Sequence, residues 1–200
     1  MGTRSLTMVY IDGEYKVAQY GQWDGYPEGQ GVICLHFLRD EMKEEKFREA
    51  LKEVRYLNRS DISDIWKEFG ADEEGMIRCE DADRLKRVYP ELHRETAAKI
   101  LNMIQERKLK APGLQNDLEF AAESLYCEWA YVIDLDKRTF EVYEGYNTKE
   151  LEETDRFYFL KNKEEGKYHG VKLMKQYSLD DLPTDIQFGK DCSQEEEEEE

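Results

Sequence analysis

A glycine-rich stretch near the N-terminus, GQWDGYPEGQG at residues 21–31, gathers side chains that recognise ligands. Trp23 and Tyr26 offer rings for stacking, neighbouring amides and carboxylates supply hydrogen bonds, and glycine lets backbone N–H groups approach a bound molecule. Because binding residues concentrate in loops on a rigid scaffold, we predict a ligand-binding loop over residues 20–31. Its members are Gln19, Tyr20, Gln22, Trp23, Asp24, Tyr26, Glu28 and Gln30. In the alternative interpretation, Trp23 covers the end of a sheet and the glycines serve only turns.

The same stretch lacks the patterns that hold phosphate. It contains no GxxxxGK[ST] sequence, and Cys34 stands where a dinucleotide fingerprint that began at Gly29 would need its third glycine. Asp24 and Glu28 would also repel phosphate. We therefore predict no nucleotide cofactor.

The residues that most often carry catalysis or metal ions form no recognisable pattern. His36, His93 and His169 are far apart, and none has a partner four residues away, as a helical metal site would require. There is no calcium-loop order of acids and no GxSxG elbow. The neighbouring Glu128 disfavours a thiolate at Cys127. We predict no metal site, and the sequence leaves open whether the protein is an enzyme.

Charge and cysteine usage narrow the class of protein. The 200 residues carry a formal net charge of −17, and the run of glutamates at 195–200 contributes six of these charges. Repulsion from phosphate opposes nucleic-acid binding, since no basic patch offsets it. The cysteines are widely spaced without a CxxC pair, and we see neither a signal peptide nor a membrane-spanning run. We expect a cytoplasmic protein with reduced thiols and no membrane partner.

Two β-hairpins are expected to position the loop. Residues 3–11 and 15–20 are rich in β-formers, and Asp12-Gly13 between them favours a type I′ turn. Alternation over residues 129–135 and a return strand around 140–142 predict the second hairpin. We expect a further strand pair over 156–160 and 172–177, with its turn at 164–166. The result is an α+β domain with an antiparallel sheet.

A helical middle segment, about residues 41–126, separates the hairpins. A helix over 32–38 precedes it, and apolar spacing then predicts helices over 47–57, 60–69, 80–88, 97–104 and 118–125. Ser60 and Asp61 are the expected cap of the second of these five, and Gly70 its end. Trp66 and Phe69 at this spacing are typical of core residues. We predict one domain over residues 1–185, little regular structure after Pro183, and an acidic disordered tail over 186–200.

Two segments resemble an uncharacterised protein family found in phage, bacterial and fungal genomes. The first comprises GTR at 2–4, LT at 6–7 and AQYGQWDGYPEGQG at 18–31, and the second is YCEWAYVID at 126–134. The resemblance is firm over about the first forty residues. That family has no established activity, so the resemblance implies no catalytic role.

The opening hairpin also looks like the start of N-terminal-nucleophile amidohydrolases, which use residue 1 of the mature chain as base and nucleophile. Removal of Met1 would expose Gly2, which has no nucleophile, and Thr3 would serve only after a further cleavage. Arg4 joins the predicted ligand-binding set, because in such a site it would clamp a carboxylate or phosphate. As an ordinary strand residue it would be a solvated charge.

Three hypotheses about the function therefore remain open. The first is a binding domain for a small polar or aromatic ligand, or for a partner, through the loop at 20–31. The second is a hydrolase resembling the amidohydrolases. The third is an acidic protein-interaction or charge-mimic protein, although here the carboxylates alternate with Lys and Arg.

Overall fold

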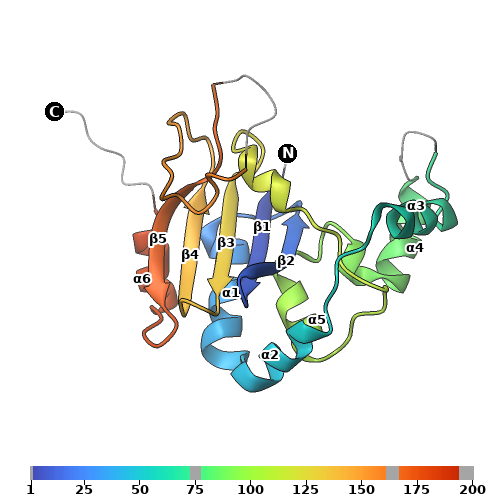
Figure 1. Cartoon of the computed structure of the whole chain (residues 1–200), viewed down its shortest axis with the longest axis horizontal. Helices are drawn as coiled ribbons and strands as arrows, with labels where there is room; N and C mark the ends of the chain where they lie inside the picture. The colour runs from blue at the N-terminus through green and yellow to red at the C-terminus, as the bar shows by residue number, and fades with distance from the viewer. Residues whose placement is uncertain (1, 73–77, 161–166, 194–200) are drawn as a thin grey trace.

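A five-stranded sheet in the order β2-β1-β3-β4-β5 crosses the protein (Figure 1). The computed structural model describes residues 2–72, 78–160 and 167–193. The strands are β1 (Ser5–Ile11), β2 (Glu14–Gly21), β3 (Trp129–Asp134), β4 (Thr139–Glu144) and β5 (Lys172–Ser178). With the helices described below, they confirm the predicted α+β class and its two hairpins, β1-β2 and β3-β4.

The sheet is mixed, because β1 and β3 run parallel while the other neighbouring pairs are antiparallel. The expectation of a wholly antiparallel sheet is therefore wrong at its centre. β2 ends beside the start of β1, where Gly21 pairs with Ser5, and the chain returns to the same end to begin β3, where Trp129 pairs with Ser5. Since β1 and β3 both begin at this end of the sheet, they run in the same direction.

The turn of the first hairpin has the expected geometry. Asp12 and Gly13 have φ angles of 55° and 80°, as a type I′ turn requires at both central residues. Their backbone N–H groups each donate to the Asp136 carboxylate at 3.0 Å. The turns of the two hairpins are thus joined across the parallel pair of strands.

Six α-helices and several shorter helical turns are described. The helices are α1 (Val32–His36), α2 (Glu44–Lys52), α3 (Arg59–Glu68), α4 (Cys79–Val88), α5 (Ile100–Gln105) and α6 (Asp185–Asp191). π-helical turns at Pro27–Gly31 and Phe37–Glu41 flank α1, and 3₁₀ turns lie at Pro90–Leu92, Ala97–Lys99 and Leu118–Ala122. The helical middle segment is thereby confirmed in outline, although residues 118–125 form only a 3₁₀ turn.

The cap of α3 lies slightly earlier than predicted. The Asn58 side chain accepts hydrogen bonds from the backbone N–H groups of Ser60 and Asp61, and the Asp61 carboxylate accepts one from the Asn58 N–H, which completes a capping box. Gly70, with φ of 75°, follows the end of α3 as expected.

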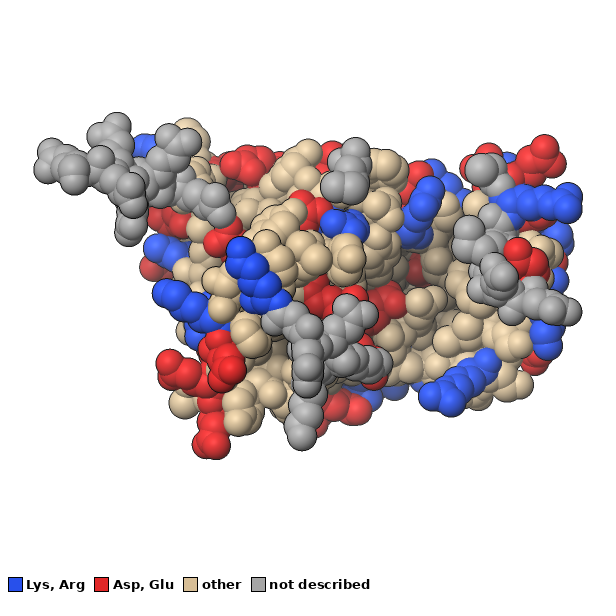
Figure 2. Space-filling model, turned by 90° about the horizontal axis from the view of Figure 1, so that it is seen from above, with Lys and Arg blue, Asp and Glu red and all other residues tan. Residues whose placement is uncertain are grey.

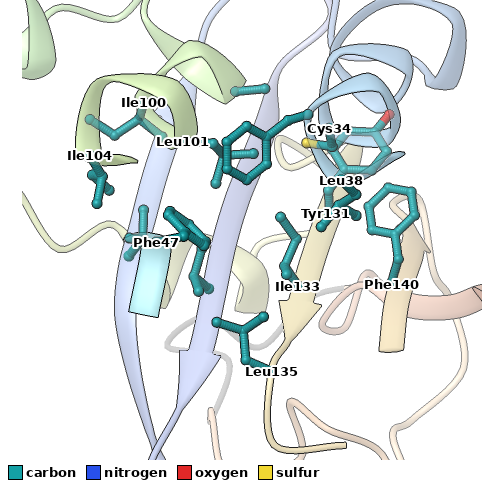
Figure 3. Packing of buried hydrophobic residues seen from close by; sticks show 14 of the residues in the cluster. Cys34, Leu38, Phe47, Ile100, Leu101, Ile104, Tyr131, Ile133, Leu135 and Phe140 are labelled. Atoms are coloured by element: carbon teal, nitrogen blue, oxygen red, sulfur yellow. The ribbon is translucent and has the colours of Figure 1, made fainter. Parts of the chain in front are cut away.

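Each face of the sheet packs into its own core. Tyr131, Ile133 and Phe140 point to one face, where they meet residues of α1, α2, α5 and α6 (Figure 3). On the other face, Met8 and Val132 pack under residues 118–122 and 151–160. A third, smaller cluster joins α3 and α4, which lie beyond the β2 edge (Figure 1).

Two predicted elements near the C-terminus are wrong. Residues 156–160 form turns rather than a strand, and β5 pairs with β4 instead. Phe157 is buried in the second core, which holds this segment flat against the sheet. After Pro183 the chain forms α6, capped by Thr184, so the predicted tail does not begin at residue 186. The predicted turn at 164–166 and the glutamate run at 195–200 lie outside the described residues.

Among the described residues, no helix combines the length and the apolar character that crossing a bilayer requires.

Candidate functional site

The predicted loop is shorter than expected. β2 continues to Gly21, the irregular part covers residues 22–26, and helical structure begins at Pro27. Proline suits the first helical position, because its φ is already helical and its missing N–H would have no partner there. Gly29 and Gly31 therefore lie in a helical turn rather than in the loop.

Hydrogen bonds hold the irregular part firmly. Gly25 N–H donates to the Thr3 carbonyl at 2.9 Å, and the Gly25 carbonyl accepts from the Tyr131 hydroxyl at 2.7 Å. The side chain of Gln30 donates to the Trp23 carbonyl and accepts from Ala98 N–H, both at 3.2 Å. The Gln30 amide, predicted to bind a ligand, thus fixes the loop to its scaffold.

Gly29 allows a close backbone approach. A Cβ at this position would lie 2.1 Å from the Asp24 carbonyl oxygen, which accepts a hydrogen bond from Gln30 N–H at 2.8 Å. We expect Gly29→Ala to lower the free energy of unfolding by about 1–3 kcal/mol, since the backbone must shift. Chemical denaturation of the wild type and the variant measures this.

Gly189→Ala is the matched control, because a Cβ there meets nothing within 4 Å and the position is inside α6. It should be neutral or stabilise by up to about 1 kcal/mol. Equal effects of the two substitutions would show that the close approach at Gly29 does not matter.

Four side chains of the predicted loop remain exposed, and they define the loop surface: Trp23, Asp24, Tyr26 and Glu28. Trp23 is 44% exposed and Tyr26 43%. Trp23 also lies against the N-terminus, where a Cβ at Gly2 would be 2.1 Å from its ring. The glycines of the loop thus serve close packing, while the two rings face solvent.

Arg4 lies beside this loop in a partly buried ion pair with Glu128. Its backbone N–H donates to Glu128 Oε1 at 3.1 Å, and its Nε lies 3.4 Å from the same oxygen. The guanidinium lies over the Tyr126 ring, 5.2 Å from the centroid, and the Tyr146 hydroxyl donates to Glu128 Oε2. With 18% of its side chain exposed, Arg4 is not a solvated strand charge. The pair joins the segment before β1 to the start of β3.

Gln19 and Tyr20 lie in a separate place, a cleft of about 200 Å³ between the β2 edge and α3. We call it the edge cleft, and its lining residues are Gln19, Tyr20, Trp66, Glu91, Leu92, Arg94, Gln115 and Asp117. Gln22 lies next to it, where its side-chain oxygen accepts from the Tyr20 hydroxyl at 2.7 Å. The predicted set of site residues is thus divided among the loop surface, the Arg4–Glu128 pair and the edge cleft.

Sequence reasoning missed most of the edge cleft. Trp66 was expected in the core but is only partly buried, and it forms part of the cleft wall. Phe69 is fully buried, as predicted. Glu91 and Asp117 carry no signal in the sequence, because their burial depends on contacts with distant residues.

A larger cleft of about 370 Å³ lies between the sheet and residues 154–159. At its base, Arg156 bridges Asp134 and Glu141 and lies over the Tyr10 ring, 5.3 Å from the centroid. The Glu141 carboxylate also accepts from the hydroxyls of Thr139 and Tyr143, and Asp134 accepts from two backbone N–H groups. We call this the sheet-face cleft. Protein groups supply the ion-pair and hydrogen-bond partners of Asp134 and Glu141, which is typical of a structural ion-pair cluster.

Among the described side chains, the thiols and imidazoles show no catalytic arrangement. Cys127 is fully buried, and burial raises the pKa of its thiol, as it raises that of the Cys34 thiol to about 12. His36 pairs with Asp185 at 2.8 Å, while burial lowers the pKa of His93. Within the described part of the chain, no three His, Cys, Asp or Glu side chains converge as a metal site would require.

Comparison with protein-family models, with curated proteins and with solved structures finds no match to this chain.

Proposed function

We propose that the protein is a soluble, cytoplasmic binding domain whose loop surface recognises a small polar or aromatic ligand or a partner. The observation that carries the proposal is the pairing of a fixed backbone with exposed rings. Gly25 and Gln30 are tied to the scaffold by several hydrogen bonds, while Trp23 and Tyr26 each leave over two fifths of their surface to solvent.

The physical advantage of this arrangement is preorganisation. Binding costs free energy when it must order a loop, and here the backbone is ordered before a ligand arrives. Aromatic rings supply large apolar contact areas that also stack, so two exposed rings on a rigid support suit a planar ligand. Asp24 and Glu28 favour ligands that donate hydrogen bonds over phosphates. The free thiols of Cys34 and Cys127 support a reducing compartment.

The charge-mimic hypothesis gains less support. Figure 2 shows Lys and Arg side chains interspersed with Asp and Glu on the face seen from above the view of Figure 1. A mimic of DNA would need its carboxylates aligned without intervening cations. The hydrolase hypothesis has no observation in its favour, and its test is the mature N-terminus.

A thermal-shift screen with nucleosides, aromatic amino acids and sugars tests the proposal on the wild type and Trp23→Ala. A ligand at about one hundred times its Kd adds roughly 2.7 kcal/mol of stability, which corresponds to a rise of about 5–10 °C in Tm. We expect this shift to be lost in Trp23→Ala.

Tyr158→Ala is the control, because Tyr158 is a similarly exposed ring outside the loop surface. It should retain the shift. A ligand that stabilises Trp23→Ala as much as the wild type would contradict the proposal. Intact mass shows whether the chain starts at Met1, Gly2 or Thr3, and turnover lost in Thr3→Ala would instead support a hydrolase.

A further inference from the structure

The end of the sheet at which β1 and β3 begin gathers exposed aromatic rings from three distant parts of the chain. Trp23 follows β2, Tyr126 precedes β3 and Tyr146 follows β4, and their exposed fractions are 44%, 48% and 51%. Large exposed apolar groups that lie together mark binding surfaces, and Trp and Tyr are enriched at interfaces. None of the three rings lines the edge cleft or the sheet-face cleft. They therefore belong to a surface that neither cleft includes.

The segment before β1 joins two of these rings. A Cβ at Gly2 would lie 2.1 Å from the Trp23 ring, so the ring lies directly against the backbone there. Two residues further on, the Arg4 guanidinium lies over the Tyr126 ring, 5.2 Å from its centroid. Contacts with residues 2–4 thus connect the loop surface to Tyr126.

The third ring is fixed to the same group of residues. Glu128 pairs with Arg4 through one carboxylate oxygen, and its other oxygen accepts from the Tyr146 hydroxyl at 3.1 Å. The Tyr168 ring packs edge-on against Tyr146, with the centroids 6.3 Å apart. Because the rings are placed before a partner arrives, binding need not order them. We call this surface the sheet-end strip, and its members are Trp23, Arg4, Tyr126 and Tyr146.

Hydrogen-bond donors along the strip are available to a partner. Arg4 reaches Glu128 Oε1 through Nε and Nη2, both at 3.4 Å, which is long beside the 2.7–2.9 Å of a strong charge-assisted bond. Within the described part of the chain, neither the Tyr126 hydroxyl nor the Trp23 indole N–H has a hydrogen-bond partner. A partner that offers carbonyl oxygens would satisfy these donors.

Two carboxylates define the charge at one end of the strip. Asp24 and Glu28 of the loop surface are exposed, and neither forms an ion pair with another described residue. They attract Lys and Arg and repel phosphate, so they favour a partner with a basic end over a nucleic acid. A second copy of the chain is also disfavoured, because each copy carries a formal charge of −17.

An extended proline-rich peptide matches these features. A polyproline II helix has no internal hydrogen bonds, so its carbonyl oxygens are free to accept, and proline-rich segments dock on surfaces lined by aromatic rings. We propose that the sheet-end strip binds a polyproline II segment of a partner protein, and that a basic residue of this segment pairs with Asp24 and Glu28. The inference rests on the proposed function, because Trp23 belongs to both surfaces, and it names the partner.

Isothermal titration calorimetry with three synthetic decapeptides tests the proposal on the wild type. The probe has eight prolines between two arginines, so that it can bind in either direction, and we expect a Kd below about 1 mM. A peptide with four Gly-Ser repeats between the same arginines should bind at least about tenfold more weakly, since its flexible chain must be ordered. Eight prolines between two glutamates should also bind about tenfold more weakly, because the ends are repelled.

Variants then assign the contacts. Tyr126→Ala, Tyr146→Ala and Trp23→Ala should each weaken binding of the arginine–proline probe by about tenfold, because each removes a ring from the strip. Tyr158→Ala is the matched control, since Tyr158 is 48% exposed, like Tyr126, but lies outside the strip. It should leave the Kd within about twofold.

Several results would overturn the proposal. They are the absence of heat from the arginine–proline probe up to about 5 mM, equal binding of the Gly-Ser peptide, and unchanged binding in Tyr126→Ala and Tyr146→Ala. Tighter binding of cellohexaose than of the probe would also overturn it and would indicate a polysaccharide partner.

The proposed function fails or survives separately. A small ligand that requires Trp23, without binding of the probe, would support the loop surface and overturn the peptide proposal. Binding of the probe that requires Tyr126 and Tyr146 but not Trp23 would support the strip and count against the loop surface.

Discussion

Arg156→Ala should lower the free energy of unfolding by about 3–5 kcal/mol, because it leaves two buried carboxylates without their cation. The Arg156 side chain is 11% exposed, and Asp134 and Glu141 are almost completely buried. Arg156 also ties residues 151–160 to the sheet, so its loss removes both a charge and a clamp. Urea denaturation followed by circular dichroism measures the effect.

Two controls separate charge from packing. Arg156→Met keeps the apolar stem, and it should still lose most of the stability that Arg156→Ala loses. Arg138→Ala removes a cation whose side chain is 40% exposed, and it should cost less than about 1 kcal/mol. If Arg156→Met were as stable as the wild type, packing rather than charge would account for the effect of Arg156→Ala.

The elements that sequence reasoning found are those whose signal is local. Asp12-Gly13 specifies its turn through two positive φ angles, and Gly70 marks the end of α3 in the same way. The parallel pairing of β1 with β3 has no such signal, because it depends on where a long helical segment returns. Residues 156–160 have β-forming composition, but Arg156 and Phe157 gain more from tertiary contacts than from a strand.

The residues of the candidate site also fall into two groups, those with a local sequence signal and those placed only by tertiary contacts. Trp23 and Tyr26 were identified because rings among glycines are unusual, and both are exposed. Gln19 and Tyr20 were included for their proximity to the loop, yet they line a different cleft. Glu91 was missed because it is one of 46 acids, and its burial involves tertiary contacts such as the hydrogen bonds from the backbone of residues 110 and 111.

Phe188→Ala should cost about 3–5 kcal/mol, although its position was expected to lie in a disordered tail. Phe188 is fully buried, with its ring 5.9 Å from that of Phe140 and 5.8 Å from that of Tyr177. α6 therefore completes the core that covers one face of the sheet. Removal of the ring leaves a cavity between α6, β4 and β5, and thermal and urea unfolding should both detect it.

Ile186→Ala on the same helix is the matched control. Ile186 is 74% exposed, so its truncation should change stability by less than about 0.5 kcal/mol. A large difference between the two variants requires that α6 folds with the sheet and that the domain extends at least to residue 191. If Phe188→Ala were as mild as Ile186→Ala, the helix would contribute nothing to the core, and the boundary predicted at residue 185 would be correct. The comparison thus decides, within seven residues of chain, where the folded domain ends.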